Sequence, residues 1–175
     1  MTQIGSDVLK NNLGSVARIY EWDFEIPAPP AASSGDVWFV RAQTAIIPGK
    51  EFEDIHIDYK ATGGFNVPGR EKYSHEFPVT LIESQDSLTF QAINNWQDMI
   101  VDATDGTGTP DNDLKTDAII MLQDESDNNW MTIQIVGIYP KRVGDVKLTY
   151  GEPGAIKYDV VFSYDRWIVL NTANS

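Results

Sequence analysis

The residues with the clearest capacity for chemistry are two histidines, His56 and His75, each followed by a nearby carboxylate. Imidazole nitrogens with Asp58 or Glu76 as a third ligand would suit an ion such as zinc. Both histidines lie in segments where apolar and polar residues alternate, which predicts β-strands. His56 falls on the polar side of its segment, whereas His75 shares its alternation with Tyr73, so the two are expected to point to opposite sides. This argues against a metal site, because metal ligands converge on one point.

A second candidate is the acidic segment at residues 102–117, which is rich in Gly, Thr and Asp. Its carboxylates are Asp102, Asp105, Asp111, Asp113 and Asp117. Several carboxylates suit a hard cation such as calcium. Their spacing matches neither the EF-hand loop nor the calcium-binding nonapeptide repeat. We therefore favour a solvated surface loop, and cation binding by this loop stays an open alternative.

Motifs for covalent catalysis are missing from the sequence. The chain has no cysteine and no GxSxG, and the glycines at positions 63, 64 and 69 do not follow a phosphate-loop spacing. Carboxylates are too abundant to identify the paired acids of a glycosidase. We expect a protein that is not an enzyme, with no cofactor and no metal.

Charge and length narrow the class further. The chain has 175 residues and a formal net charge of −13, from 26 acidic and 13 basic residues. Such a surface repels polyanions and does not suit specific nucleic-acid binding. No run approaches the roughly 20 apolar residues of a membrane span, and the N-terminus does not follow the pattern of a signal peptide. A hydrophobic content of 42% predicts one globular domain.

Periodicity predicts the elements that carry these residues. Residues 1–15 are expected to form an N-terminal arm, 16–168 a β domain and 169–175 a C-terminal tail. Strands are predicted at 16–26, 37–47, 118–123, 130–139, 146–150 and 156–164, and a helix at about 87–101, where Phe90, Ile93 and Trp96 share one face. With the central segment described next, this makes a mainly β fold, a barrel or sandwich of about eight strands with one flanking helix.

The central segment, residues 52–82, has the clearest amphipathic pattern. Its arms at 55–60 and 73–81 alternate apolar and polar residues, and both arms are expected to form strands. The residues between them are rich in glycine and include Pro68 and Gly69. We therefore predict a two-stranded element with an irregular loop at 61–72 rather than a tight hairpin.

The order of motifs along the chain resembles a known family. The sequence reads RIYEWDFEI at 18–26, VRAQTAIIPG at 40–49, GFNVPG at 64–69, FPVTL at 77–81 and NW at 95–96. It ends with GIYP at 137–140, VGDV at 143–146 and YDVVFSYDRW at 158–167. This succession resembles the tail tube protein of contractile-tailed bacteriophages over about residues 16–168, and departs from it at 102–117.

The resemblance implies a structural role. Tail tube proteins fold as a β-barrel or sandwich with a flanking helix and form hexameric rings whose sheets join around a channel. The rings stack into a tube that conducts DNA at infection. The implied partners are further copies of the chain, the tail sheath protein, a tape-measure protein in the lumen, the baseplate tube initiator and the tail terminator. The implied location is the phage tail of the virion, after synthesis in the host cytoplasm.

The resemblance also directs attention to two groups of residues. The polar face of the central element is expected to line the channel or meet the next subunit, through His56, Asp58, Lys60, Glu76 and Thr80. Ring-to-ring contacts are expected from the region 48–69, with Phe65, Asn66, Val67, Pro68 and Gly69 as the stacking residues.

Three alternatives remain from the sequence. The nearest is another protein of the same fold, such as a baseplate tube initiator or the tube protein of a type VI secretion system or contractile bacteriocin. The second is a carbohydrate-binding β-sandwich that uses Trp22, Trp38 or Trp167 as a platform. The third is an acidic glycoside hydrolase.

Overall fold

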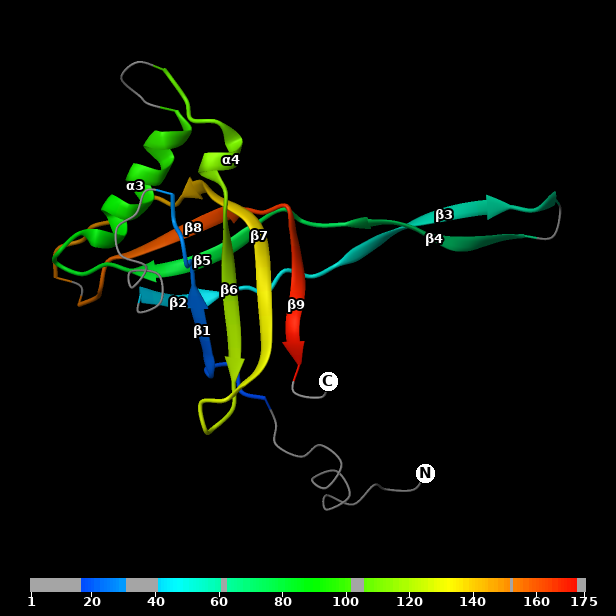
Figure 1. Ribbon diagram of the computed structural model, residues 1–175, viewed down its shortest axis with the longest axis horizontal. Coiled ribbons are helices and arrows are strands. Elements are labelled where there is room, and N and C mark those ends of the chain that lie inside the picture. Colours follow the sequence, from blue (N-terminus) through cyan, green and yellow to red (C-terminus); the bar gives the residue numbers. More distant parts are fainter. Residues whose placement is uncertain (1–16, 31–40, 61–62, 102–105, 152, 173–175) are drawn as a thin grey trace.

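The computed structural model describes residues 17–30, 41–60, 63–101, 106–151 and 153–172, and Figure 1 shows their arrangement. They form nine strands and two helices. The elements are β1 (Trp22–Glu25), β2 (Ala42–Ala45), β3 (Glu51–Asp58), β4 (Gly64–Lys72), β5 (Phe77–Ile82), α3 (Leu88–Ile100), α4 (Asp111–Leu114), β6 (Thr116–Gln123), β7 (Asn129–Val143), β8 (Lys157–Ser163) and β9 (Arg166–Thr172).

Seven strands form one antiparallel sheet that bends at β7. Its path runs β1-β6-β7-β8-β5-β2, and β9 also pairs with β7. The first part of β7 pairs with β6 and β9, and the part after Ile138 pairs with β8, so β7 belongs to both halves of the sheet. The two halves run in different directions, as Figure 1 shows. Among the described strands β1 and β2 do not pair with each other, so the sheet is a sandwich rather than a closed barrel.

The bend in β7 depends on Gly137. Its φ of 72° lies in the left-handed region, where residues with a side chain are strained. A side chain there would also collide with Asp165, whose carboxylate accepts hydrogen bonds from Lys115 Nζ at 3.0 and 3.2 Å. The Gly137 amide donates to Asp117 Oδ1 at 3.0 Å. Carboxylates of β6 and of the β8–β9 turn therefore flank the bend.

The core lies between the two halves of the sheet and under α3. The rings of Phe24 on β1 and Phe77 on β5 lie 5.8 Å apart, which joins the halves. From α3, Ala92, Ile93 and Trp96 are buried in the same cluster. Helical periodicity places these three side chains on one face, which is why the sequence forms a helix that packs on a sheet.

Two carboxylates and one arginine cap the beginning of α3. Asp86 accepts from the Leu88 amide at 3.1 Å, and Glu83 accepts from the Phe90 amide at 2.8 Å. Arg41, which precedes β2, donates to Asp86 Oδ2 at 2.6 Å and to Glu83 Oε1 at 3.2 Å. Carboxylates at a helix N-terminus satisfy free amide groups and interact favourably with the helix dipole. This network ties the helix to β2.

The mainly β fold class and the single long helix are confirmed, the helix to within one residue at each end. The strands predicted at 118–123, 130–139 and 156–164 are present in the structure. The strands predicted at 16–26 and 37–47 are present over part of their length. The strand predicted at 146–150 is wrong, because these residues form no strand and Leu148 and Tyr150 are exposed. The structure also has a strand, β9, at 166–172, where none is predicted. The predicted arm at 1–15 lies outside the described residues.

The central segment is where prediction and structure differ most. The arms at 55–60 and 73–81 do not pair with each other. Instead β3 pairs with β4, which occupies the predicted irregular loop, and β5 lies in the large sheet between β2 and β8. The prediction failed because Pro68 and Gly69 are usually signs of a turn. Here they lie within β4, where the register with β3 shifts between Phe52 and Asp54, and a two-stranded ribbon tolerates this irregularity.

Candidate assembly interface

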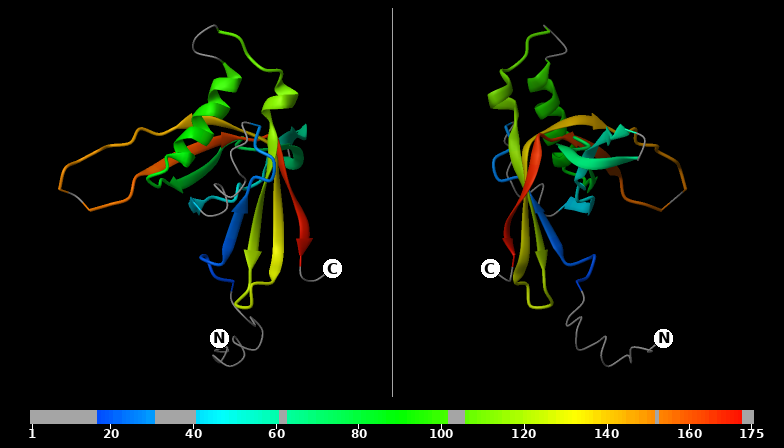
Figure 2. Two further views of the ribbon diagram at one scale, coloured as in Figure 1. Left: turned by 60° about the vertical axis from the view of Figure 1, so that its left-hand side comes forward. Right: turned by 90° about the vertical axis from the view of Figure 1, so that its right-hand side faces the viewer.

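The β3–β4 hairpin projects away from the rest of the molecule, as Figures 1 and 2 show. Every residue of β3 is exposed. The register pairs Ile55 with Val67 and Ile57 with Phe65 on one face, and His56 with Asn66 on the other. Because side chains alternate along both strands, the hairpin has one apolar face and one polar face.

The apolar face of the hairpin consists of Ile55, Ile57, Phe65 and Val67 and has no cover within the described part of the chain. Ile55 is 54% exposed and Phe65 is 55% exposed. A two-stranded ribbon is marginally stable in water without a third strand or a helix to pack against. Apolar surface of this kind commonly marks a protein interaction site. The hairpin is therefore a candidate assembly surface.

The polar face is organised around His56. Its Nδ1 lies 2.7 Å from Asn66 Oδ1, across the strand pair, and its Nε2 lies 3.0 Å from Asp58 Oδ1. Each ring nitrogen of His56 therefore lies within hydrogen-bonding distance of a neighbouring side chain. His75 lies elsewhere, with Nδ1 2.8 Å from the carbonyl oxygen of Tyr164. His56 therefore lies on β3, whereas His75 lies in the segment between β4 and β5, and the two histidines do not share a site.

The base of the hairpin is held by Lys50. Its Nζ lies 2.9 Å from Glu71 Oε1 and 4.7 Å from the ring centroid of Trp167 on β9. The ammonium group holds the pKa of Glu71 below its usual value, and Glu71 in turn raises the pKa of Lys50. A cation over an aromatic ring adds electrostatic attraction. Lys50 thus connects both strands of the hairpin base to the large sheet.

The five predicted channel-lining residues do not form one surface. His56 and Asp58 lie together on the polar face of β3, and Lys60 follows at the end of that strand. Glu76 precedes β5 and pairs with Lys141 at 2.8 Å, which holds the pKa of Glu76 below its usual value. Thr80 lies on β5 and donates to Asp159 Oδ1 at 2.7 Å. The five predicted stacking residues, in contrast, are consecutive in β4.

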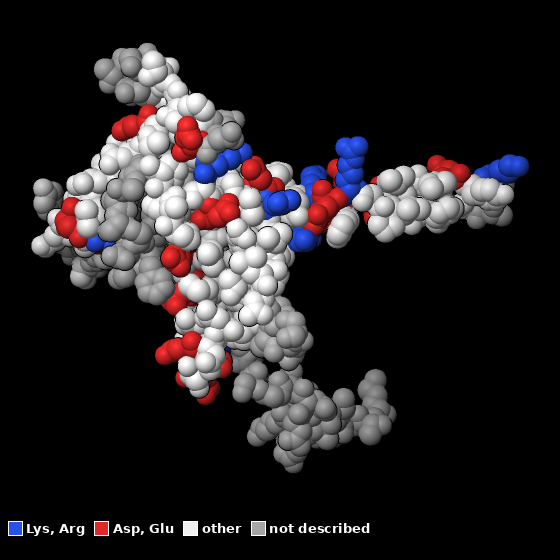
Figure 3. All heavy atoms as spheres, in the orientation of Figure 1, with Lys and Arg blue, Asp and Glu red and all other residues white. Residues whose placement is uncertain are grey.

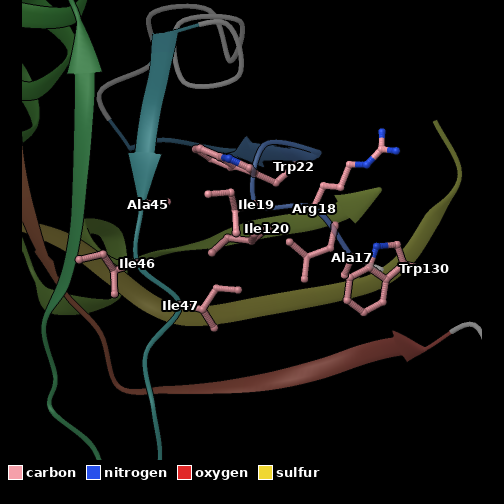
Figure 4. Close-up of a pocket in the computed structure, with 10 residues that line it drawn as sticks. Ala17, Arg18, Ile19, Trp22, Ala45, Ile46, Ile47, Ile120 and Trp130 are labelled. Atoms are coloured by element: carbon pink, nitrogen blue, oxygen red, sulfur yellow. The ribbon is translucent and has the colours of Figure 1, made fainter. Parts of the chain in front are cut away.

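The body carries an apolar groove of about 450 Å³ on the sheet face near the end of β6. Figure 4 shows its side chains, which come from the segment before β1, from β1, β2, β6 and β7, and from the segment after β2. They include Trp22, Ile46, Ile47, Ile120, Leu122 and Trp130. Ile46 and Ile47 lie just beyond the end of the short strand β2 and are exposed. The sequence pattern does not indicate that they line a groove.

The described residues contain no cluster of three or more His, Cys, Asp or Glu side chains suited to a metal ion. Asp102 and Asp105 lie outside the described residues, so the predicted acidic loop is seen only in part. Trp22 and Trp167 are half-buried, and Trp38 is not among the residues described. Within the described chain no helix has the length and apolar character needed to cross a membrane.

Comparisons with solved structures show the fold. The tube-terminating cap of the anti-feeding prophage aligns with a TM-score of 0.66 at 12% identity, covering 90% of this chain and 93% of that one. The sheath–tube complex of the PVC extracellular contractile injection system aligns with a TM-score of 0.63 at 12% identity, covering 96% and 100%. The tail tube of SPP1 aligns with a TM-score of 0.51 at 12% identity, covering 88% and 78%.

Sequence comparison identifies the family. No curated protein sequence matches the chain. The family model described as "Phage tail tube protein" matches residues 23–170, which is most of the chain and extends from β1 into β9. This span agrees with the resemblance seen in the motif order. The chain belongs to the phage tail tube protein family.

Proposed function

We propose that this protein is the structural subunit of the inner tube of a contractile phage tail, where hexameric rings stack into a conduit for DNA. Family membership over residues 23–170 is the observation that carries the proposal. The fold is shared with proteins of contractile injection systems, including a sheath–tube complex and a terminating cap. The family and the fold are those of structural tube proteins.

The strand edges support lateral joining into a ring. In one half of the sheet the order is β1-β6-β7-β9, so β1 and β9 are its two edges. Ile168, Val169 and Leu170 on β9 are exposed. An exposed apolar edge strand is prone to pair with another chain. Edge pairing between neighbours would satisfy these backbone groups and close a ring.

The hairpin supports stacking. It extends beyond the body and presents Phe65 and Val67 on its apolar face, followed by Pro68 and Gly69, which are among the predicted stacking residues. The polar face with His56, Asp58 and nearby Lys60 would then remain toward solvent or the channel. On β5, the side chain of Thr80 points to the face away from the core, whereas Val79 and Leu81 point into the core. Thr80 and Glu76 stay candidates for the channel wall.

The charge of the chain suits a conduit. A net charge of −13 repels the phosphates of DNA, so that the duplex passes without being held. The proposed partners are the sheath outside the tube, the tape-measure protein and DNA inside it, and the initiator and terminator at its ends.

A baseplate tube initiator is the second candidate, because the fold is also shared with a baseplate assembly at a TM-score of 0.67 and 12% identity. Copy number separates the two, since a tube protein is present in many rings per particle and an initiator in a single ring. Quantitative mass spectrometry of whole particles measures this number.

Negative-stain electron microscopy of the purified chain at high concentration tests the proposal. We expect rings or tubes of uniform bore. A chain that stays monomeric at high concentration, even with pre-formed rings as a seed, would contradict a tube function.

A further inference from the structure

The loop between β7 and β8, at residues 144–156, is open. Figure 2 shows that it stands out from the body with two separate arms. Residues 145–149 of the first arm and 153–157 of the second arm line a hollow of about 410 Å³. This volume falls in the range of roughly 300–1,000 Å³ that is usual for ligand clefts.

The main chain of both arms lacks partners. The ladder between β7 and β8 ends with a hydrogen bond from the Gly144 amide to the Asp159 carbonyl at 2.8 Å. Beyond it, the described residues of the loop make one main-chain hydrogen bond, in which the Ile156 carbonyl accepts from the Glu83 amide at 2.9 Å. Unpaired amide and carbonyl groups along a strand edge are a template for pairing with another chain.

The second arm is held toward β5, which keeps the loop from closing on itself. The bond at Ile156 continues the pairing of Ile82 on β5 with Lys157 on β8. Because β8 lies between β5 and β7, the other edge of the second arm faces the first arm and the hollow. Pro153 also has no amide hydrogen to donate to the first arm.

The first arm has the sequence of a strand that lacks a neighbour. Val146, Leu148 and Tyr150 alternate with polar residues, which is typical of a strand with one apolar face. Leu148 is 75% exposed, and Tyr150 is fully exposed. On the second arm Ile156 is exposed as well. A strand between the arms would therefore find apolar side chains on both sides as well as main-chain partners.

We propose that the open loop is a receptor for one extended strand of another tail protein, which inserts between the two arms and pairs with both. Such strand addition gains affinity from main-chain hydrogen bonds and specificity from side-chain contacts. The inserted strand has to be free along both edges, so it comes from a terminal or linker segment and not from the interior of a sheet. The inference rests on the proposed function, because the strand belongs to another component of the tail.

Charge indicates the kind of strand. The charged residues that line the hollow are Asp145, Lys147 and Lys157, so bases outnumber acids there. The chain as a whole has a net charge of −13, and acidic side chains are spread over the face of the body seen in Figure 3. Within the described part of the chain neither lysine makes an ion pair. Opposite charges on neighbouring strands stabilise a sheet, so an acidic strand suits this loop.

Hydrogen exchange measured by mass spectrometry tests the proposal, because main-chain pairing slows the exchange of amide protons. We expect the amides of both arms to exchange freely in the isolated chain and in tubes built from this chain alone. In complete tails, which contain the partner, their exchange should be slower by about tenfold or more.

Each departure from this pattern has a distinct meaning. Protection in the isolated chain would show that the arms pair with each other, and protection in tubes of the chain alone would make a second copy the occupant. Either result overturns the proposal, and so does free exchange in complete tails. A chain that forms no tubes contradicts the tube function instead, and the isolated chain then still tests the strand site through peptide binding.

A synthetic strand provides this binding test. The probe is the capped peptide Val-Glu-Val-Glu-Val, which should slow amide exchange in both arms of the isolated chain. The same peptide with N-methylated amides cannot pair and should give no protection, and Val-Lys-Val-Lys-Val should bind several-fold more weakly. Free exchange at the highest soluble concentration of the acidic peptide, or equal protection by its N-methylated form, would overturn the strand site.

Two neighbouring proline variants form a matched pair. When the first arm pairs as a strand, the amides of Leu148 and Thr149 point to opposite edges, and only one of them faces the hollow. Both residues are exposed, so Leu148→Pro and Thr149→Pro each remove an amide donor without disturbing the core. We expect one variant to abolish protection of the second arm by the acidic peptide and the other to retain it. Equal effects would overturn insertion between the arms.

Charge reversal tests the acidic character of the partner. Lys147→Glu should reverse the preference of the loop from the acidic to the basic peptide, because the mutated side chain lines the hollow. Lys72→Glu makes the same change on β4 and should leave the preference unchanged. A preference that is the same in Lys147→Glu and in the wild type would overturn recognition of an acidic strand.

Discussion

The body and the hairpin of this protein solve the problem of apolar surface in opposite ways. The body buries Phe24, Phe77, Trp96 and Phe162 between two halves of a sheet and a helix. The hairpin is built from the same kinds of residues, yet Ile55, Ile57 and Phe65 are exposed. The difference teaches that amphipathic strands alone do not show whether their apolar face is buried in the same chain or kept for a partner.

Removing a core side chain from the body should have the largest effect on stability. Trp96 is fully buried, contacts the ring of Phe162 at a centroid distance of 6.0 Å and donates from Nε1 to the Leu114 carbonyl at 2.8 Å. We expect Trp96→Ala to lower the free energy of unfolding by about 3–5 kcal/mol. Urea denaturation of the monomer measures this loss.

Phe90→Ala is the control for that variant, because Phe90 is on the same helix but exposed. Its loss should be about 1 kcal/mol or less, as is usual for a surface site. Equal losses for both variants would contradict the assignment of Trp96 to the core.

The network at the start of α3 should give a smaller and pH-dependent effect. Hydrogen bonds from Arg41, Ser84 and the Leu88 amide hold the pKa of Asp86 well below its usual value of 3.8. A depressed pKa means that the ionised form stabilises the fold at neutral pH and that this contribution disappears as the pH falls through the folded-state pKa. Asp86→Asn should therefore lower the melting temperature at pH 7, and its difference from wild type should shrink below about pH 4.

Asp98→Asn is the matched control at the opposite end of α3. Near a helix C-terminus a negative charge is unfavourable, so removing it should leave the melting temperature unchanged or slightly raise it. A melting temperature of Asp86→Asn that equals wild type at pH 7 would show that the network does not stabilise the helix.

Changing the apolar face of the hairpin should have the smallest effect on the monomer. Phe65→Ser should alter the free energy of unfolding by no more than about 0.5 kcal/mol, because Phe65 contacts solvent rather than the core. The same variant should raise the concentration needed for assembly, as measured by sedimentation velocity. Asn66→Ser, on the polar face, is the control for assembly. A loss of monomer stability as large as that of Trp96→Ala would mean that the hairpin packs on its own body.

Local patterns predicted some elements well and others not at all. The helix was predicted accurately because the helical period of 3.6 residues places Ile93 and Trp96 on one apolar face, and this face is the one that is buried. Val146, Leu148 and Tyr150 alternate as convincingly as a strand, but the structure gives them no partner strand. Alternation shows that a segment is suited to pairing, and it does not supply the neighbour.

The candidate interface was predicted only in its location. Residues 48–69 were identified as a contact region, and the structure shows that most of this region forms the projecting hairpin. The prediction of an irregular loop at 61–72 was wrong because Pro68 and Gly69 are strong signs of a turn, and the alternation of Phe65 and Val67 is a weaker sign of a strand. The groove was missed because Trp22, Ile47 and Leu122 are distant in sequence and become neighbours only when β1, β2 and β6 assemble.

The sequence by itself determined the mainly β class, the one long helix, the acidic character and the family, since each depends on composition, local period or the order of motifs. Only the tertiary structure decided which strands pair, that β7 serves both halves of the sheet, and that the rest of the described chain leaves the apolar face of β3 and β4 uncovered. The physical reason is that a local pattern specifies which side of a strand is apolar, whereas long-range packing within the chain specifies what covers it.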